Sequence, residues 1–421
     1  MRSILPALLI LAPVLHAAED AASAPKKKVA AFSLLPVGSQ LKGVMLPRYD
    51  KNQRLSGVLK AKGMTLISEE TIAGETVSVE FFNPDQSPRA RVDLVTAVFN
   101  QTTGTLDARE PVTIQSDQFS AKGTGLVYAF EQGEGILLGP VTTWMRKPVQ
   151  TTMNTSHSPL RAVFGAALLC QAVVAATPPP VPPDAKAAQN GARADLAKDL
   201  DASDAANAKV RAFLEKSDLA SKSADSAPPP AAQPLDVKPG PGDTVIACDG
   251  GMYFNADEGV FVYLKNVRVS DPRFTLTGAN ELKIFLGKKP VDPAKAKPES
   301  DKKDKAASGF GKFDEVERVV ATGAVLIEQK ATADGKAPAK ASGAVFTYNV
   351  KEDTATVTGG YPWLLMNGVC LRAKQPDLIV RMSPKAGNAS AGPGDWETIV
   401  NLEQLQKDNE KNKQEKKDQN H

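Results

Sequence analysis

Gly251-Met-Tyr253-Phe254 … Asn266-Val-Arg-Val is the stretch that decides the fold of this chain. It combines a Gly, aromatic residues two and three positions later, an alternating run and a closing Asn. The same pattern recurs, with closing Gly, in two further stretches, Gly125-Leu-Val-Tyr128 … Gly139-Pro-Val and Gly343-Ala-Val-Phe346-Thr-Tyr348 … Gly359-Gly-Tyr. In chain order the spacings are 14, 15 and 16 residues, a length that predicts one β-hairpin per unit. Because one hairpin cannot bury its apolar face alone, the units must stack or fold over, as in proteins that bind rather than catalyse.

Two β-rich regions contain these units, residues 28–150 and residues 244–385. In the first region Val77, Val79 and Phe81 alternate with polar residues, and several runs of the second region alternate in the same way. Alternation with a period of two over short runs, bounded by Gly and Asn turns, is the sequence signal of a strand. We therefore predict a mainly β protein with two β domains.

The remaining stretches differ in composition. Residues 177–243 are rich in Pro and Ala and are typical of a semi-rigid, partly helical linker, with a partner-binding helix as the alternative. Residues 288–312 are rich in Lys, Asp and Pro and lack apolar periodicity, which predicts a disordered insertion within a hairpin. Residues 386–421 are predicted to form a polar tail.

The first 18 residues have the features of a secretory signal peptide. Arg2 supplies the positive start, an apolar run begins at Ile4, and small residues at Ala17 and Ala18 form a cleavage site. A short uncleaved anchor is the alternative, and both interpretations predict that the chain leaves the cytoplasm.

A second apolar segment, residues 159–176, repeats the pattern of a signal peptide inside the chain. Three interpretations stay open: the relic of a fusion between two exported proteins, a membrane-associated helix between domains, or an ordinary buried helix. Cys170 does not qualify as a lipidation site, because the large Leu169 precedes it and the position is internal.

Composition argues against several classes of function. The formal net charge of +3 leaves no nucleic-acid footprint. The three histidines, His16, His157 and His421, lie outside both β-rich regions, which removes His-based catalysis and imidazole metal sites from them. The three cysteines have no CxxC spacing, and no phosphate-binding Gly loop is present. We expect no enzyme, no catalytic residues, no metal and no cofactor.

Specific sequence segments in both regions resemble those of a known family. In the second region they are Val245-Ile-Ala-Cys-Asp-Gly-Gly-Met-Tyr-Phe-Asn, Asn266-Val-Arg-Val-Ser-Asp-Pro-Arg-Phe-Thr-Leu-Thr-Gly, Val316-Glu-Arg-Val-Val-Ala-Thr-Gly and Ala341-Ser-Gly-Ala-Val-Phe-Thr-Tyr-Asn. This region resembles the OstA-like (LptA-type) family of periplasmic lipopolysaccharide-transport proteins. The first region resembles the related LptC type more weakly, through Met45-Leu-Pro-Arg-Tyr-Asp and Phe119-Ser-Ala-Lys-Gly-Thr-Gly-Leu-Val-Tyr.

The resemblance implies open β-jellyrolls of stacked antiparallel strands that join edge to edge in the periplasm. It implies that lipid A acyl chains pass along an apolar groove from the inner to the outer membrane, with other transport components at both membranes as partners, and that the family is not catalytic. Family members usually carry one such domain, whereas this chain carries two and an insertion.

The candidate interior residues for lipid binding all come from the second region: Phe254, Phe261, Tyr263, Phe274, Leu276, Phe285, Ile327, Phe346 and Tyr348. An interior of this kind would stabilise each buried CH₂ group by about 0.8 kcal/mol. Plain core packing is the alternative role for each of them, since core and groove are continuous in such a fold.

Three functional hypotheses follow. The first is lipid carriage, and the second is a non-catalytic envelope scaffold that assembles through exposed sheet edges. The third, a hydrolase built on Asp249, Asp257, Glu258 and Asp271, is weak because no pocket is indicated around these acids. In an oxidising compartment a disulfide between Cys248 and Cys370 is possible, although their spacing does not settle it.

Overall fold

The computed structural model describes residues 35–49, 52–83, 85–116, 119–146, 183–217, 240, 242–256, 258–287, 316–330, 338–383 and 388–400. Of residues 183–191 it describes only the helical backbone. The predicted signal peptide, the apolar segment 159–176 and the predicted insertion 288–312 lie outside the described residues. So do Cys170 and the three histidines.

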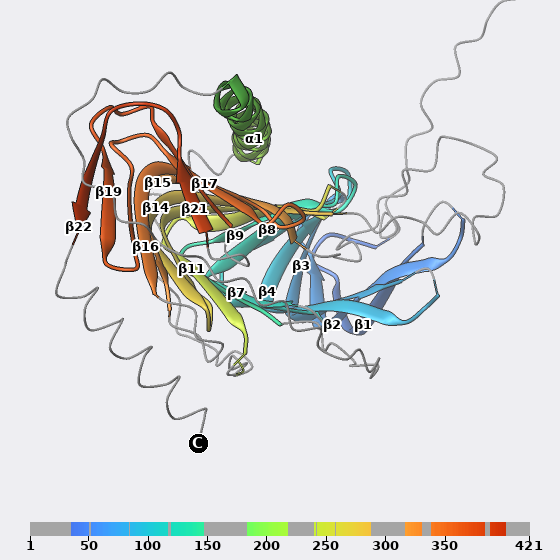
Figure 1. The fold of residues 1–421 in the computed structure, drawn as a ribbon. Coiled ribbons are helices and arrows are strands. Elements are labelled where there is room, and N and C mark those ends of the chain that lie inside the picture. Colours follow the sequence, from blue (N-terminus) through green and yellow to red (C-terminus); the bar gives the residue numbers. More distant parts are fainter. Residues whose placement is uncertain are drawn as a thin grey trace, which may run out of the picture.

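The described chain is mainly β, with 22 strands in one antiparallel sheet and one α-helix (Figure 1). The first region contributes β1 (Gln40–Tyr49), β2 (Leu55–Leu66), β3 (Thr71–Phe82), β4 (Pro88–Asn100), β5 (Thr105–Ala108), β6 (Val112–Ser116), β7 (Phe119–Gly123), β8 (Gly125–Ala129), β9 (Glu134–Leu138) and β10 (Val141–Met145). The linker contributes α1 (Pro183–Lys216).

The second region contributes β11 (Thr244–Cys248), β12 (Gly251–Asn255), β13 (Val260–Ser270), β14 (Phe274–Leu286), β15 (Val316–Gln329), β16 (Ala339–Asn349), β17 (Thr354–Thr358), β18 (Trp363–Met366), β19 (Val369–Ala373), β20 (Ile379–Ser383), β21 (Asn388–Ala391) and β22 (Trp396–Val400). The predicted fold class, two β-rich jellyroll regions joined by a partly helical linker, is confirmed. The last two strands, however, fall in the predicted polar tail. They form because β21 and β22 extend the edges offered by β20 and β19, a non-local pairing that local composition does not reveal.

Several long strands change direction near their middle. The bends coincide with breaks in strand register and with left-handed backbone at Thr76 (φ 49°) in β3, Asn266 (φ 49°) in β13, Gly278 (φ 75°) in β14 and Gly323 (φ 131°) in β15. Left-handed residues and irregular pairing of this kind redirect a strand. Together the bends form a crease along which the sheet folds over on itself.

The crease divides the sheet into two layers. Beyond it, β4 pairs through residues 98–100 with β5 and through residues 90–94 with β6, so its two halves belong to different layers. Layer 1 contains the short strands β5, β8, β9, β12, β17, β20 and β21. Layer 2 contains β6, β7, β10, β11, β18, β19 and β22.

The three recurring sequence stretches are the hairpins of layer 1. They correspond to β8 with β9, β12 with the first half of β13, and the second half of β16 with β17. Their terminal glycines stand at the crease, where Gly139, Gly251 and Gly359 have φ of 68°, 109° and 74°. The prediction of one hairpin per unit is therefore confirmed.

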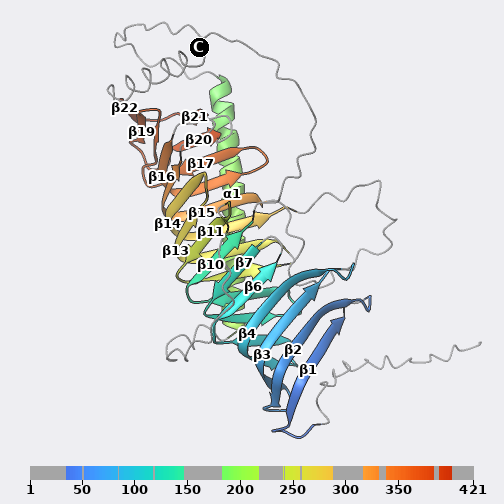
Figure 2. The ribbon, with the colours of Figure 1, turned by 90° about the horizontal axis from the view of Figure 1, so that it is seen from below.

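The two β-rich regions join directly, although α1 and the rest of the linker separate them in sequence (Figure 2). In layer 2, β10 pairs with β11 from Val141↔Cys248 to Met145↔Thr244. In layer 1, β9 pairs with β12 from Leu137↔Met252 to Glu134↔Asn255. The sheet thus continues through the joint, and among the described strands β1 lies at one end and β21 and β22 at the other.

One apolar core fills the space between the layers in both regions. It runs without interruption from Leu59 in β2 to Val325 in β15. Rings from opposite layers meet in it edge to face, with centroids 6.1 Å apart for Phe81 and Tyr128 and 5.8 Å apart for Phe119 and Phe261. The second of these pairs crosses the joint.

Helix α1 covers the outer face of layer 1 at the joint. Its buried residues Val210 and Phe213 pack against Ile136 of the first region and against Tyr253 and Val262 of the second. No helix in the described ranges is long and apolar enough to cross a membrane.

Candidate functional site

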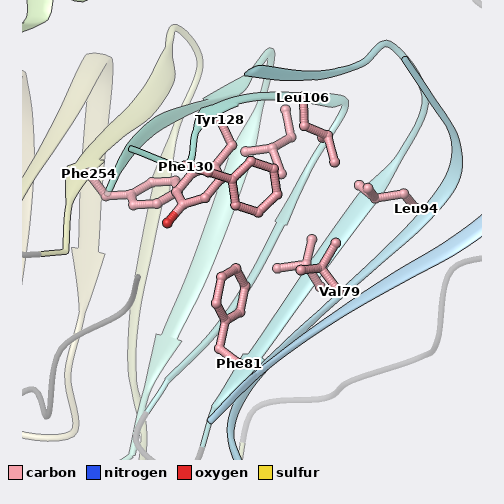
Figure 3. Close-up of a pocket in the computed structure, with 9 residues that line it drawn as sticks. Val79, Phe81, Leu94, Leu106, Tyr128, Phe130 and Phe254 are labelled. Atoms are coloured by element: carbon pink, nitrogen blue, oxygen red, sulfur yellow. The ribbon is translucent and has the colours of Figure 1, made fainter. Parts of the chain in front are cut away.

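An apolar pocket lies between the two layers, mostly within the first region (Figure 3). Since inward and outward side chains alternate along a strand, every second residue of the surrounding strands points into the interior. The lining residues are Val79, Phe81, Val92 and Leu94 from layer 2, Leu106, Leu126, Tyr128 and the adjoining Phe130 from layer 1, and Phe254 from β12.

Aromatic rings form the wall of the pocket that faces the joint. Tyr128 stacks on Phe254 at 5.9 Å with an interplanar angle of 18°, and it meets Phe130 edge to face at 4.9 Å. Figure 3 shows these rings grouped on one side of the space, with Val79 and Leu94 across from them. Such packing gives the pocket a carbon surface apart from the Tyr128 hydroxyl.

The pocket is narrow in this conformation. Its volume is about 10 Å³, close to the minimum for a single water molecule. An acyl chain fits only when side chains rotate or the layers part.

Most of the sequence-predicted lipid residues lie in the interior. Four are almost fully buried in the core between the layers: Phe254, Phe261, Tyr263 and Leu276. Three more, Phe274, Ile327 and Phe346, are half-buried against the same core. Tyr348 is also half-buried, and its hydroxyl group donates a hydrogen bond to Asp353 at 3.2 Å. Of these eight residues, Phe254 alone lines the pocket described above.

The prediction that Phe285 lies in the interior was wrong. Phe285 packs against the outer cluster beneath α1, and the guanidinium carbon of Arg318 lies 4.9 Å from its ring centroid. The reason is strand alternation: the neighbouring Ile284 points into the core, so Phe285 must point to the other face.

The possible disulfide between Cys248 and Cys370 does not form, because both thiols are free. Cys248 lies in β11 and Cys370 in β19, and the pairings from β11 through β13, β14, β15, β16 and β18 to β19 separate them. Six steps of about 4.8 Å each exceed by far the roughly 7 Å limit for bridged Cα atoms.

The acids of the hydrolase hypothesis are engaged in structural contacts. Asp271 accepts hydrogen bonds from Thr244 Oγ1 at 2.6 Å and from Arg273 Nε at 2.9 Å. Burial alone would raise the pKa of Asp271, but these hydrogen bonds and the Arg273 charge outweigh it and hold the pKa below its usual range. Asp249 binds Asn266 and Arg268, while Glu258 binds Lys209 of α1. Asp257 lies outside the described residues.

No constellation for metal binding occurs in the part of the chain that the structure describes, where no three His, Cys, Asp or Glu side chains come together. The pocket offers apolar surface, which supports the burial of hydrocarbon.

Sequence reasoning missed the pocket residues of the first region. Their signal was present, because Val77, Val79 and Phe81 alternate, as do Leu126, Tyr128 and Phe130. Alternation shows that one face of a strand is apolar, but it does not show which two faces meet across a pocket.

No family model and no curated protein matches the chain. Eleven chains of solved structures match. One is LptH from Pseudomonas aeruginosa, described as the LptA-homologous periplasmic component of the lipopolysaccharide transport device. It is 16% identical, the alignment covers 38% of this chain and 94% of LptH, and the TM-score is 0.28. Such a likeness says nothing about function.

Proposed function

We propose that this protein is a non-catalytic periplasmic carrier that binds lipopolysaccharide through its lipid A acyl chains and bridges them from the inner toward the outer membrane. The observation that supports the proposal most directly is the apolar interior, which continues through the joint of the two regions from β2 to β15. A continuous interior offers an acyl chain the same environment at every position along the sheet.

The energetics favour such a ligand. Each CH₂ group that leaves water for this interior contributes about 0.8 kcal/mol, so one chain of ten carbons would contribute roughly 8 kcal/mol before the cost of opening. The pocket of about 10 Å³ shows that opening is needed.

The layout of the layers makes opening feasible. The short strands of layer 1 pair only with layer 1 or with the long strands, and the same holds for layer 2 within the described residues. Away from the crease, side-chain packing holds the layers together. The layers can therefore part without loss of ladder hydrogen bonds.

The strands at the two ends of the sheet have unpaired edges to which a partner can bind. Strand β1 pairs with β2, and β21 and β22 pair with β20 and β19, which leaves one side of each open within the described chain. Open edges accept strands from another chain. In the proposal they receive the transport components at the two membranes or another copy of this chain. The predicted signal peptide at residues 1–18 supports a location in the periplasm.

The test is site-specific photocrosslinking in the full chain. A photoreactive phenylalanine analogue at Phe130, on the pocket wall, should crosslink to lipopolysaccharide added to the purified protein. The matched control at Arg91, whose side chain pairs with Asp93 on the outer face, should not. Equal labelling at both positions, or none at Phe130, would overturn the proposal.

The second candidate is the envelope scaffold, which the open strand edges favour. It predicts oligomers by native mass spectrometry and no lipid adduct, whereas the carrier predicts an adduct of lipid A mass.

A further inference from the structure

Arg48 occupies an unusual place in edge strand β1. It pairs with Gly57, which in turn pairs with Phe81, so all three lie on the inward face of the sheet. Leu46, two residues earlier, packs against the core on that same face. The inward-facing residues of β1 therefore include a cation, Arg48, next to the aromatic rings at this end of the core.

The Arg48 side chain spans the two layers. It starts from the half of β1 that belongs to layer 2 and reaches Phe130, which adjoins β8 in layer 1. Its guanidinium carbon lies 4.6 Å from the Phe130 ring centroid, a cation–π contact. Phe130 lines the pocket, so the guanidinium lies against a residue of the pocket wall, although Arg48 itself is not one of the lining residues.

The positive charge of Arg48 can bind an anionic ligand. Other arginines beside the sheet are bound to carboxylates, such as Arg91 to Asp93 at 2.8 Å and Arg318 to Asp199 at 2.8 Å. Arg48 forms no such ion pair within the described ranges, and Phe130 is the partner that the structure shows. Arg48 as a whole is exposed; partial burial of its guanidinium lowers its pKa, partly offset by Tyr128 and Glu131, and an arginine remains cationic at neutral pH.

We propose that the pocket between β3, β4, β5 and β8 takes an acyl chain of an anionic amphiphile and that Arg48 binds the headgroup. A carbon-lined pocket with a cation against its wall is complementary in both parts to such a molecule. The inference rests on the proposed lipid binding and goes beyond it by naming the headgroup-binding residue and the charge of the ligand.

The contact with Phe130 also bears on how the headgroup is bound. In the proposal the anionic headgroup replaces the Phe130 ring as the partner of the Arg48 guanidinium.

Calorimetric titration of the full chain tests the inference. The probes are dodecyl phosphate, the uncharged dodecyl maltoside and inorganic phosphate, the amphiphiles below their micelle concentrations. We expect dodecyl phosphate to bind at least about tenfold more tightly than dodecyl maltoside, a difference of about 1.4 kcal/mol. Inorganic phosphate should give no measurable binding, since it lacks the chain.

Variants identify the residue responsible. Arg48→Gln should abolish the preference for the anionic amphiphile, Arg48→Lys should retain most of it, and the outer-face control Arg91→Gln should leave it unchanged. Arg48→Met, which keeps the apolar stem, is the second variant if Arg48→Gln folds poorly, and it should likewise abolish the preference.

The possible failures are distinguishable. An Arg48→Gln protein with the wild-type preference, or a wild type without any preference, overturns the role of Arg48 and leaves lipid binding intact. Inorganic phosphate that binds as tightly as dodecyl phosphate overturns the acyl-chain part. Absence of binding by both amphiphiles overturns the proposed function itself.

Discussion

The two β-rich regions follow one plan, yet their interiors differ. Both consist of creased long strands and short hairpins, and in both the inward residues alternate with outward ones. In the first region the interior leaves a pocket beside Val79 and Leu106, and Arg48 contacts Phe130 on the pocket wall. In the second region the β13 residues Phe261 and Tyr263 are 2% and 0% exposed and pack in the core between the layers.

The difference shows that the backbone plan alone does not make a binding site. Valine and leucine on β3, β4 and β5 leave space between the layers, whereas large rings on β13 close it. Most of the sequence-predicted lipid residues are aromatic, and several of them are packed in the core. In the pocket, by contrast, medium-sized residues such as Val79 and Leu94 lie across from the rings of Tyr128 and Phe130 (Figure 3).

Phe254 connects the interiors of the two regions. Its replacement should lower the free energy of unfolding more than the other changes below. It belongs to the second region, is 1% exposed, and stacks on Tyr128 in the first. Phe254→Ala should lower the free energy of unfolding by about 3–5 kcal/mol, since it leaves a cavity at the joint. Urea denaturation measures this, with half-buried Phe274→Ala as the milder control. Equal losses for both variants would mean that the regions do not share one core.

Gly135 tests how tightly the regions meet. A Cβ atom there would lie 2.8 Å from Tyr128 Cδ2, 2.9 Å from Phe254 Cζ and 2.9 Å from the Val127 carbonyl oxygen. Gly135→Val should therefore cost about 1–3 kcal/mol through overpacking. Gly63→Ala is the matched control, because its Cβ would meet Glu75 Oε2 at an ordinary 3.7 Å. A Gly135→Val protein as stable as the wild type would show that the residues at the joint can move to accommodate the larger side chain.

Two ion pairs of unequal burial bind helix α1 to the second region. Asp199 and Arg318, 2.8 Å apart, have side chains 14% and 20% exposed, whereas Asp195 in the pair with Arg381 is 65% exposed. Asp199→Ala should cost about 1 kcal/mol, and Asp195→Ala less than about 0.5 kcal/mol. Thermal unfolding of both variants checks the order. The reverse order would contradict the docking of α1 described here.

Acid should destabilise the second region through two carboxylates. Burial alone would raise the pKa of Glu281, but Lys283 and Asn207 outweigh it, and the pKa of Asp271 is likewise lowered in the folded state. A lowered folded pKa contributes stability above the unfolded value of about 4, and this contribution is lost as pH falls through the folded pKa.

Denaturation at pH 7 and pH 3 checks this expectation. Asp271→Asn should be less stable than wild type at pH 7 and should lose less stability on acidification. A variant with an unchanged pH dependence would mean that Asp271 carries no part of it.

Several features were predictable because their causes are local. The spacing from Gly125 to Gly139 and from Gly251 to Asn266 predicted hairpins, since a hairpin depends on its own turns and alternation. The Pro- and Ala-rich linker predicted a helical element, observed as α1. The prediction that Phe285 faces the interior was wrong. Alternation along β14 places Ile284 in the core and Phe285 on the opposite face, and the sequence does not show which of the two faces is the inner one.

The sequence by itself determined the β-rich class, the hairpin units and the helical linker, because alternation, Gly turns and composition act within a few residues. The tertiary structure alone decided that β9 and β10 pair with β12 and β11, that Phe254 completes the pocket of the first region, and that Arg48 meets Phe130. It also decided that Cys248 and Cys370 stay apart. These are contacts between strands distant in sequence, and which faces meet depends on register and on the fold-over at the crease, for which no local pattern supplies a partner.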